Sequence, residues 1–204
     1  MSKHRLPKIN FIEIKTLSES RFDFVKNDIL RENICITMQY VVFLNSFNKD
    51  YDLPGALSYS VFKTIIIYTA SIIESLINYK LQELIRAKKV KESDLMDKLV
   101  TYQCFKKTDY KLSDHETITA GIKKITKAKK LSDETILRDL NIAAKRAGLF
   151  DYKLFFEAEK IRKKRNNIHL TGLSDVDDRY TQKDVNDLFR SARKIIDRIE
   201  HYEK

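Results

Sequence analysis

The sequence predicts an all-α protein, a single bundle of long helices, and three observations support this. The chain of 204 residues contains only 4 Gly and 2 Pro, whereas an all-β fold needs many tight turns built from such residues. Hydrophobic residues make up 43% and charged residues 33% of the chain, which is typical of a globular protein and not of a disordered one. Apolar residues also recur at helical spacing over several long stretches. We therefore expect one helical domain over residues 1–204.

Two long helices are predicted in the N-terminal half. The first extends from about Glu19 to Phe47 and is followed by the turn-rich segment NKDYDLPG at residues 48–55. The second extends from about Leu57 to Lys88, and its middle is apolar on all sides, which places it at the centre of the bundle. Its apolar run TIIIYTASII, residues 64–73, is too short to cross a bilayer, so we expect a buried helix.

The segment 86–130 is the least regular part of the chain and carries 13 Lys or Arg against 6 Asp or Glu. A small irregular or hairpin insertion is expected around residues 100–125, where VTYQCF and TITAGI have the composition of a short strand pair. The basic run KKITKAKK at residues 123–130 either contacts phosphates or forms a solvated face. Because no aromatic residues are interleaved with these lysines, the pattern favours the solvated face.

Three further helices are predicted towards the C-terminus. The first opens at Ser132 and is stopped by Gly148. Asp151 caps the next helix, whose apolar stripe includes Ala158 and Ile161. Thr181 followed by Asp184 resembles a capping box, which opens the closing helix. That helix has the clearest amphipathic pattern of the chain: Val185, Leu188, Phe189, Ala192, Ile195, Ile196 and Ile199.

The formal net charge of +10 indicates an anionic partner, with nucleic acid first and a membrane surface second. A basic protein without any polyanion partner is the alternative. Cys35 and Cys104 stand alone, without the CxxC or Cys/His spacing of a zinc site. The N-terminus has basic residues without a following apolar core, so we expect no signal peptide and a cytoplasmic location. We expect no cofactor, no metal and no membrane association.

The segment RKKRNNIHL, residues 162–170, is the strongest candidate for a functional site. At about 100° per residue, Arg162, Arg165, Asn166 and His169 share one sector beside the apolar stripe of Ile161. Lys163, Lys164 and Asn167 point elsewhere and are expected at the surface. The basic run therefore divides into a solvated group and a group held against the edge of the core.

The residues of this sector have the chemistry that RNA cleavage without a metal requires. A histidine near neutral pKa can take the proton of a ribose 2′-hydroxyl or return one to the leaving oxygen. An arginine can hold the scissile phosphate through parallel hydrogen bonds and stabilise the negative charge that develops on it. We therefore predict His169 as the acid/base, Arg165 and Arg162 as phosphate clamps, and Asn166 as a positioning group.

In this segment the chain resembles the HEPN family, small helical bundles with an Arg, a polar residue and a His a few positions later. The apolar helix IIIYTASIIESLINYKL and the closing helix YTQKDVNDLFRSARKIIDRI are similar to helices of that family, so the resemblance covers about residues 56–204. Residues 19–47 would then form an additional helix packed on this HEPN-like core. Arg165 has the usual Asn166 after it but only three residues before His169, whereas Arg162 has six, with Lys163 in the polar position.

The resemblance implies a metal-independent endoribonuclease in which two subunits pair and line one cleft with their Arg and His residues. Many members of the family are toxins or antiphage effectors, which implies RNA as the substrate and an antitoxin or regulatory protein as a further partner. Other members are non-catalytic RNA binders or scaffolds. The second hypothesis is therefore a HEPN-like module that dimerises or binds RNA without cleaving it.

A structural role for the same residues remains open, because cations in the last turn of a helix stabilise it through the helix dipole. Glu74 is the only acid between residues 53 and 82 and stands in an apolar helix. Since a buried carboxylate needs a partner, we predict that Glu74 pairs with Arg162 or Arg165 and orients the site. His115 within SDHE and the acidic run DVDD at 175–178 are predicted to be polar connectors and not metal sites.

Overall fold

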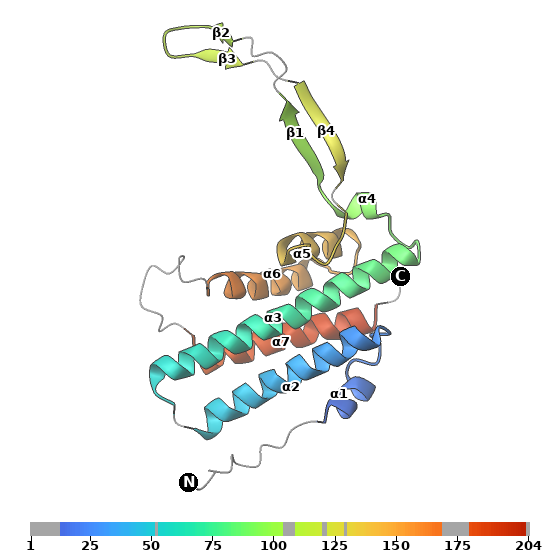
Figure 1. The fold of residues 1–204 in the computed structure, drawn as a ribbon, viewed down its shortest axis with the longest axis vertical. Coiled ribbons are helices and arrows are strands. Elements are labelled where there is room, and N and C mark those ends of the chain that lie inside the picture. The colour runs from blue at the N-terminus through green and yellow to red at the C-terminus, as the bar shows by residue number, and fades with distance from the viewer. Residues whose placement is uncertain are drawn as a thin grey trace.

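The helices form the body of the protein, and two antiparallel ribbons project from it (Figure 1). The structure is a computed structural model that describes residues 13–51, 53–103, 109–119, 122–128, 130–168 and 180–202. At residues 98–103, 109, 119 and 122–128 the description is of the backbone alone. The predicted all-α bundle with a hairpin insertion is confirmed.

The helices are α1 (Ile14–Ser20), α2 (Asp28–Asp50), α3 (Gly55–Arg86), α4 (Glu92–Leu95), α5 (Leu137–Arg146), α6 (Tyr152–Asn166) and α7 (Gln182–Glu200). The strands are β1 (Lys98–Gln103), β2 (Asp109–Lys111), β3 (Thr117–Thr119) and β4 (Ile122–Ala128). The central helix is α3, which contacts α2, α5, α6 and α7. The predicted helix 57–88 matches α3 closely.

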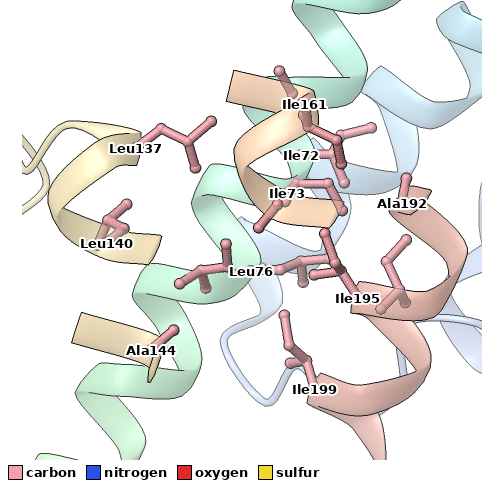
Figure 2. Close-up of a cluster of buried hydrophobic side chains, with 14 of the residues drawn as sticks. Ile72, Ile73, Leu76, Leu137, Leu140, Ala144, Ile161, Ala192, Ile195 and Ile199 are labelled. Carbon is pink, nitrogen blue, oxygen red and sulfur yellow. The ribbon is translucent and has the colours of Figure 1, made fainter. Parts of the chain in front are cut away.

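The core is built around the middle of α3, whose apolar side chains face three neighbouring helices (Figure 2). Ile72, Ile73 and Leu76 of α3 are all at most 3% exposed. They meet residues of α5, α6 and α7: Leu137, Leu140, Ala144, Ile161, Ala192, Ile195 and Ile199. Burial of this apolar surface is the main stabilising contribution to the bundle.

The predicted first helix is wrong in its extent, because the chain forms two helices with a turn between them. In the turn between α1 and α2, Phe22 and Val25 are both 0% exposed. The side chain of Asn27 then caps α2 by accepting a hydrogen bond from the Leu30 N–H at 3.0 Å. These two turn residues are apolar and buried, so apolar positions continue between the helices at a spacing typical of a helix. The sequence therefore does not show where α1 ends and α2 begins. Ile29, an apolar residue within the predicted range, is 76% exposed.

The length of α3 exceeds that of the apolar run on which the sequence prediction rests. Over its 32 residues an 18-residue window reaches a mean hydropathy of 1.5, enough to cross a membrane by length and composition alone. Half of that window is buried inside the bundle, as expected for the core helix of a soluble protein. The cytoplasmic location stays a prediction.

The C-terminal helices follow their predicted signals except at the start of α5. Ser132 does not cap this helix; it forms a turn in which its N–H donates to Thr135 Oγ1 at 2.9 Å, and α5 begins at Leu137. Asp151 caps α6 by accepting from the Leu154 N–H at 2.7 Å, as predicted. Thr181 and Asp184 form the predicted capping box at the start of α7.

The insertion is an extended arm of two ribbons, and its strand pairing differs from the prediction. VTYQ belongs to β1, which pairs with β4, whereas TIT forms β3 and pairs with β2. The register sets Tyr102 opposite Lys123 and Thr101 opposite Lys124. The basic run expected as a solvated face thus supplies a strand of the arm, which extends away from the helices (Figure 1).

We expect Leu76→Ala to lower the free energy of unfolding by about 2–5 kcal/mol, because it leaves a cavity where α3 meets its neighbours. Urea unfolding followed by circular dichroism measures this loss. Ile29→Ala, at a 76% exposed position, is the control and should change the stability by at most about 0.5 kcal/mol. Similar losses in the two variants would contradict the central position of α3.

Candidate functional site

Arg162 is held in an ion pair on its own helix. Its Nε lies 2.9 Å and its Nη2 2.8 Å from Glu159 Oε2, and the side chains are 21% and 15% exposed. The other carboxylate oxygen of Glu159 accepts a hydrogen bond at 2.8 Å from the Asn141 amide of α5, a residue that is 0% exposed. The network of Asn141, Glu159 and Arg162 therefore joins α5 to α6.

Burial acts to raise the pKa of Glu159, but hydrogen bonds and nearby positive charges together lower this pKa by more. Hydrogen bonds from Arg162 and Asn141, and the charges of Arg162 and Lys163, hold the pKa below its ordinary value. Glu159 is thus a stable anionic partner of Arg162. Sequence reasoning did not assign this partner, although the spacing of three residues on one helix is a signal for such a pair.

Arg165 has a much looser environment. Its Nη2 lies 3.8 Å from Glu74 Oε2, and the two side chains are 36% and 24% exposed. The predicted proximity of Glu74 to one of the two arginines is therefore present, and the arginine is Arg165. At this distance the contact is an ion pair without a short hydrogen bond, so the guanidinium keeps donors for another ligand.

The remaining polar residues of the segment differ from one another in burial. Asn166, the last residue of α6, is exposed, whereas the helical projection sets it beside the buried stripe. At about 140° from Ile161 it is the furthest of the four from that stripe. Lys163 and Asn167 are exposed as predicted.

The prediction that Lys164 points into solvent at the surface is wrong, because this lysine forms an ion pair with Asp184. Its Nζ lies 2.8 Å from Asp184 Oδ1 and 3.2 Å from the Asp184 carbonyl oxygen. Burial would raise the pKa of Asp184, yet hydrogen bonds from Lys164 and Thr181 lower it below its ordinary value. Lys164 thus fastens the end of α6 to the first turn of α7, because Asp184 belongs to the capping box there.

His169 lies outside the described residues, so its role stays a prediction. The last described residue before it is Ile168, which is half-buried and packs against the core. Residues 175–178 also lie outside the described part of the chain. His115 is exposed, and the described ranges contain no cluster of three or more His, Cys, Asp or Glu that could hold a metal ion.

A groove of about 460 Å³ runs along α3 beside the Glu74–Arg165 contact. Its wall includes Glu74, Asn78, Gln82 and Arg86, which follow one another at intervals of four residues. Other parts of the wall come from the start of α2, with Asn27 and Leu30, and from the segment before α5 and α5 itself, with Asp133, Thr135 and Leu140. The groove thus extends along α3 to Glu74, which Arg165 contacts from α6.

Comparisons with protein-family models, with curated proteins and with solved structures find no match for this chain.

We expect Glu159→Gln to lower the free energy of unfolding near neutral pH, because Arg162 loses its charged partner. The folded-state pKa of Glu159 lies below the ordinary 4.5. Its stabilising contribution is therefore complete above the ordinary pKa and is lost as the pH falls through the lowered folded value. The stability difference between wild type and variant should shrink between about pH 6 and about pH 3 in urea titrations.

Glu134→Gln is the matched control, since Glu134 is exposed and has no ion pair among the described residues. This variant should differ little from the wild type across the same range. A Glu159→Gln difference that stayed constant or grew towards low pH would contradict the assigned charge pairing.

Proposed function

We propose that the chain is a HEPN-like metal-independent endoribonuclease, with Arg165 as its phosphate clamp and His169 as its acid/base. The observation that carries this proposal is the state of Arg165. Its guanidinium is partly exposed, and within the described part of the chain its ion pair is the 3.8 Å contact to Glu74, which lines the groove along α3. An arginine in this position can exchange a weak intramolecular contact for a phosphate.

In the proposed reaction, neutral His169 takes the proton of the ribose 2′-hydroxyl while that oxygen attacks the adjacent phosphorus. The bond to the 5′-oxygen breaks, and the departing oxygen receives a proton from a protonated histidine, the same residue or its copy in a second subunit. Parallel hydrogen bonds from Arg165 offset the charge that accumulates on the phosphate oxygens. Asn166 is exposed beside Arg165, and we assign its amide the role of positioning the substrate.

The sequence predicts both arginines as phosphate clamps, and their different contacts lead us to propose different roles for them. Arg162 is already bound by Glu159, so we assign it as a positioning residue that holds α6 against α5. Glu74 orients Arg165 across the gap between α3 and α6. Pairing of two subunits would bring two copies of this segment to one cleft, as the resemblance implies.

We further propose that the activity serves a toxin or antiphage effector in the cytoplasm, restrained by an antitoxin or another regulatory protein. This proposal has the resemblance to HEPN proteins as its only support. Growth of cells that express the wild type or His169→Ala tests it, because only an active ribonuclease should arrest growth.

We expect His169→Ala to reduce RNA cleavage by at least about 10²-fold, because general acid–base catalysis contributes about that much or more. The measurement is the cleavage rate of a labelled RNA in the presence of a chelator, with circular dichroism to verify folding. Lys163→Ala, a neighbouring exposed cation, is the control and should keep the activity. Full cleavage by His169→Ala, or cleavage that the chelator abolishes, would contradict the proposed mechanism.

The two arginines should respond differently to substitution by alanine. Arg165→Ala should lower the cleavage rate by about 10²–10³-fold with little change in thermal stability, since its contact in the folded protein is weak. Arg162→Ala should lower the thermal stability clearly, because it leaves Glu159 without its charged partner at 15% exposure. Melting curves and cleavage rates of both variants provide the measurement. If Arg162→Ala mainly lost activity and Arg165→Ala mainly lost stability, the assigned roles of the two arginines would be wrong.

The second candidate is a non-catalytic HEPN-like module that binds RNA or dimerises. The observation in its favour is the ion pair of Arg162, which leaves one arginine of the segment available instead of two. Binding of RNA by the purified wild type without any cleavage would support this module over the enzyme.

A further inference from the structure

The arm formed by β1, β4, β2 and β3 has no counterpart in the function proposed for the helical bundle. It leaves the bundle after α4 and returns at Lys130, just before α5 (Figure 1). The ribbons extend into solvent, and the described residues 110–118 near its tip are all exposed. A two-stranded ribbon without a covering layer buries little apolar surface, so the arm adds little to the stability of the bundle.

The excess positive charge of the protein is concentrated in the arm and its base. Residues 86–130 contain 13 of the 39 Lys and Arg residues and 6 of the 29 Asp and Glu residues. This segment therefore has a net charge of +7, and the other residues together have 26 cations and 23 anions, a net charge of +3. Such segregation favours a polyanionic partner at the arm over a uniformly solvated surface.

The base of the arm presents cations that lack acidic partners. Arg86, Lys88, Lys91 and Lys130 are exposed, and none of them has an ion pair within the parts of the chain that the structure describes. In the bundle, by contrast, cations at helix contacts are paired: Arg21, Arg146, Arg162 and Lys164 lie within 2.8 Å of a carboxylate oxygen. These four cations outnumber the nearby acids Glu92 and Asp94 of α4, and a bound chain of phosphates would offset the remaining excess of positive charge.

The strand register adds aromatic positions to the lysines of β4. In sequence, residues 123–130 lack aromatics, but the pairing with β1 sets Tyr102 opposite Lys123. Nearer the tip, the Tyr110 side chain is 60% exposed. Lysines that follow a phosphate backbone, combined with aromatic rings on which bases stack, are the usual means of binding single-stranded nucleic acid.

The arm base is continuous with the groove of the candidate site. Arg86 is one of the exposed cations at the base of the arm and also lines the groove that contains Glu74. Glu74 and Arg86 are twelve positions apart on α3, which corresponds to about 18 Å along the helix at 1.5 Å per residue. A nucleic-acid strand that contacts the arm base can therefore continue along α3 towards Arg165.

We propose that β4 and the base of the arm bind the phosphate backbone of single-stranded RNA and direct the strand into the groove along α3. The proposal goes beyond cleavage and does not depend on it, because binding by the arm requires neither Arg165 nor His169. An anionic membrane is the rival partner. It is disfavoured by Asp114 and Glu116, both exposed between the apolar residues Leu112 and Ile118 at the tip.

The test compares two triple variants of the full chain. Lys123→Ala/Lys124→Ala/Lys127→Ala removes three cations of β4, and Lys15→Ala/Lys49→Ala/Lys160→Ala removes three exposed cations of the bundle. The probe is a fluorescent single-stranded RNA of about 20 nucleotides with 2′-O-methyl groups, which cannot be cleaved through the 2′-oxygen. Anisotropy titrations between about 50 and 200 mM KCl give the affinity and its salt dependence.

We expect the β4 variant to bind at least about ten-fold more weakly and to lose about 2 from the slope of log affinity against log salt. Each phosphate contact on a single strand contributes about 0.7 to that slope, so three contacts account for the change. The bundle variant, with the same change in net charge, should keep both values close to those of the wild type. Circular dichroism should show both variants folded.

Equal weakening by the two variants, or an unchanged salt slope in the β4 variant, would overturn the assignment of the site to the arm. Tighter arm-dependent binding to duplex RNA or duplex DNA would overturn the single-strand assignment. Arm-dependent binding to phosphatidylserine vesicles without binding to RNA would favour the membrane. Because the probe is not cleaved, a failure of this proposal is distinct from a failure of catalysis, which His169→Ala tests.

Discussion

The bundle depends on covering the middle of α3. Ile65, Ile73 and Leu76 are fully buried there on one broad apolar face, whereas Ile67 and Tyr68 on the other side are exposed. Four other helices must therefore pack around it, and their amphipathic faces determine where they lie. The part of α3 from Glu74 to Arg86 has a polar edge that this packing leaves open. The groove is thus a consequence of how the core is covered.

Packing also decides which acidic partners three cations near the end of α6 contact. Arg162 meets Glu159 and, through it, the buried Asn141; Lys164 meets Asp184 of α7; and Arg165 has the weak contact to Glu74. Since a well-paired arginine must lose its partner before it can bind a phosphate, availability differs among residues of one basic run. The helix that contacts α5 and α7 through Arg162 and Lys164 thus leaves Arg165 in a looser contact than either.

In the proposed function, the arm separates the region that binds RNA from the region that cleaves it. Its base and β4 carry most of the excess positive charge, while the candidate Arg165 belongs to α6 and contacts Glu74, which lies further along α3. In the proposed function, separation of a strongly basic binding region from a nearly neutral reaction region would let the protein hold a polyanion without saturating Arg165 with unrelated phosphates. Both regions adjoin the same groove, since Arg86 and Glu74 line it.

The sequence alone determined the helical class, the extent of α3, the caps at Asp151 and Thr181, and the apolar face of α7, because these depend on local spacing and capping chemistry. It also brought Glu74 together with an arginine, because an isolated acid in an apolar helix needs a counter-charge. Only the tertiary structure decided which arginine, since Arg162 is bound by Glu159, whose carboxylate also accepts a hydrogen bond from Asn141 of α5. It likewise decided the break before α2 and the opposition of Tyr102 and Lys123 in the arm. Those features depend on contacts between residues distant in the sequence, which periodicity does not encode.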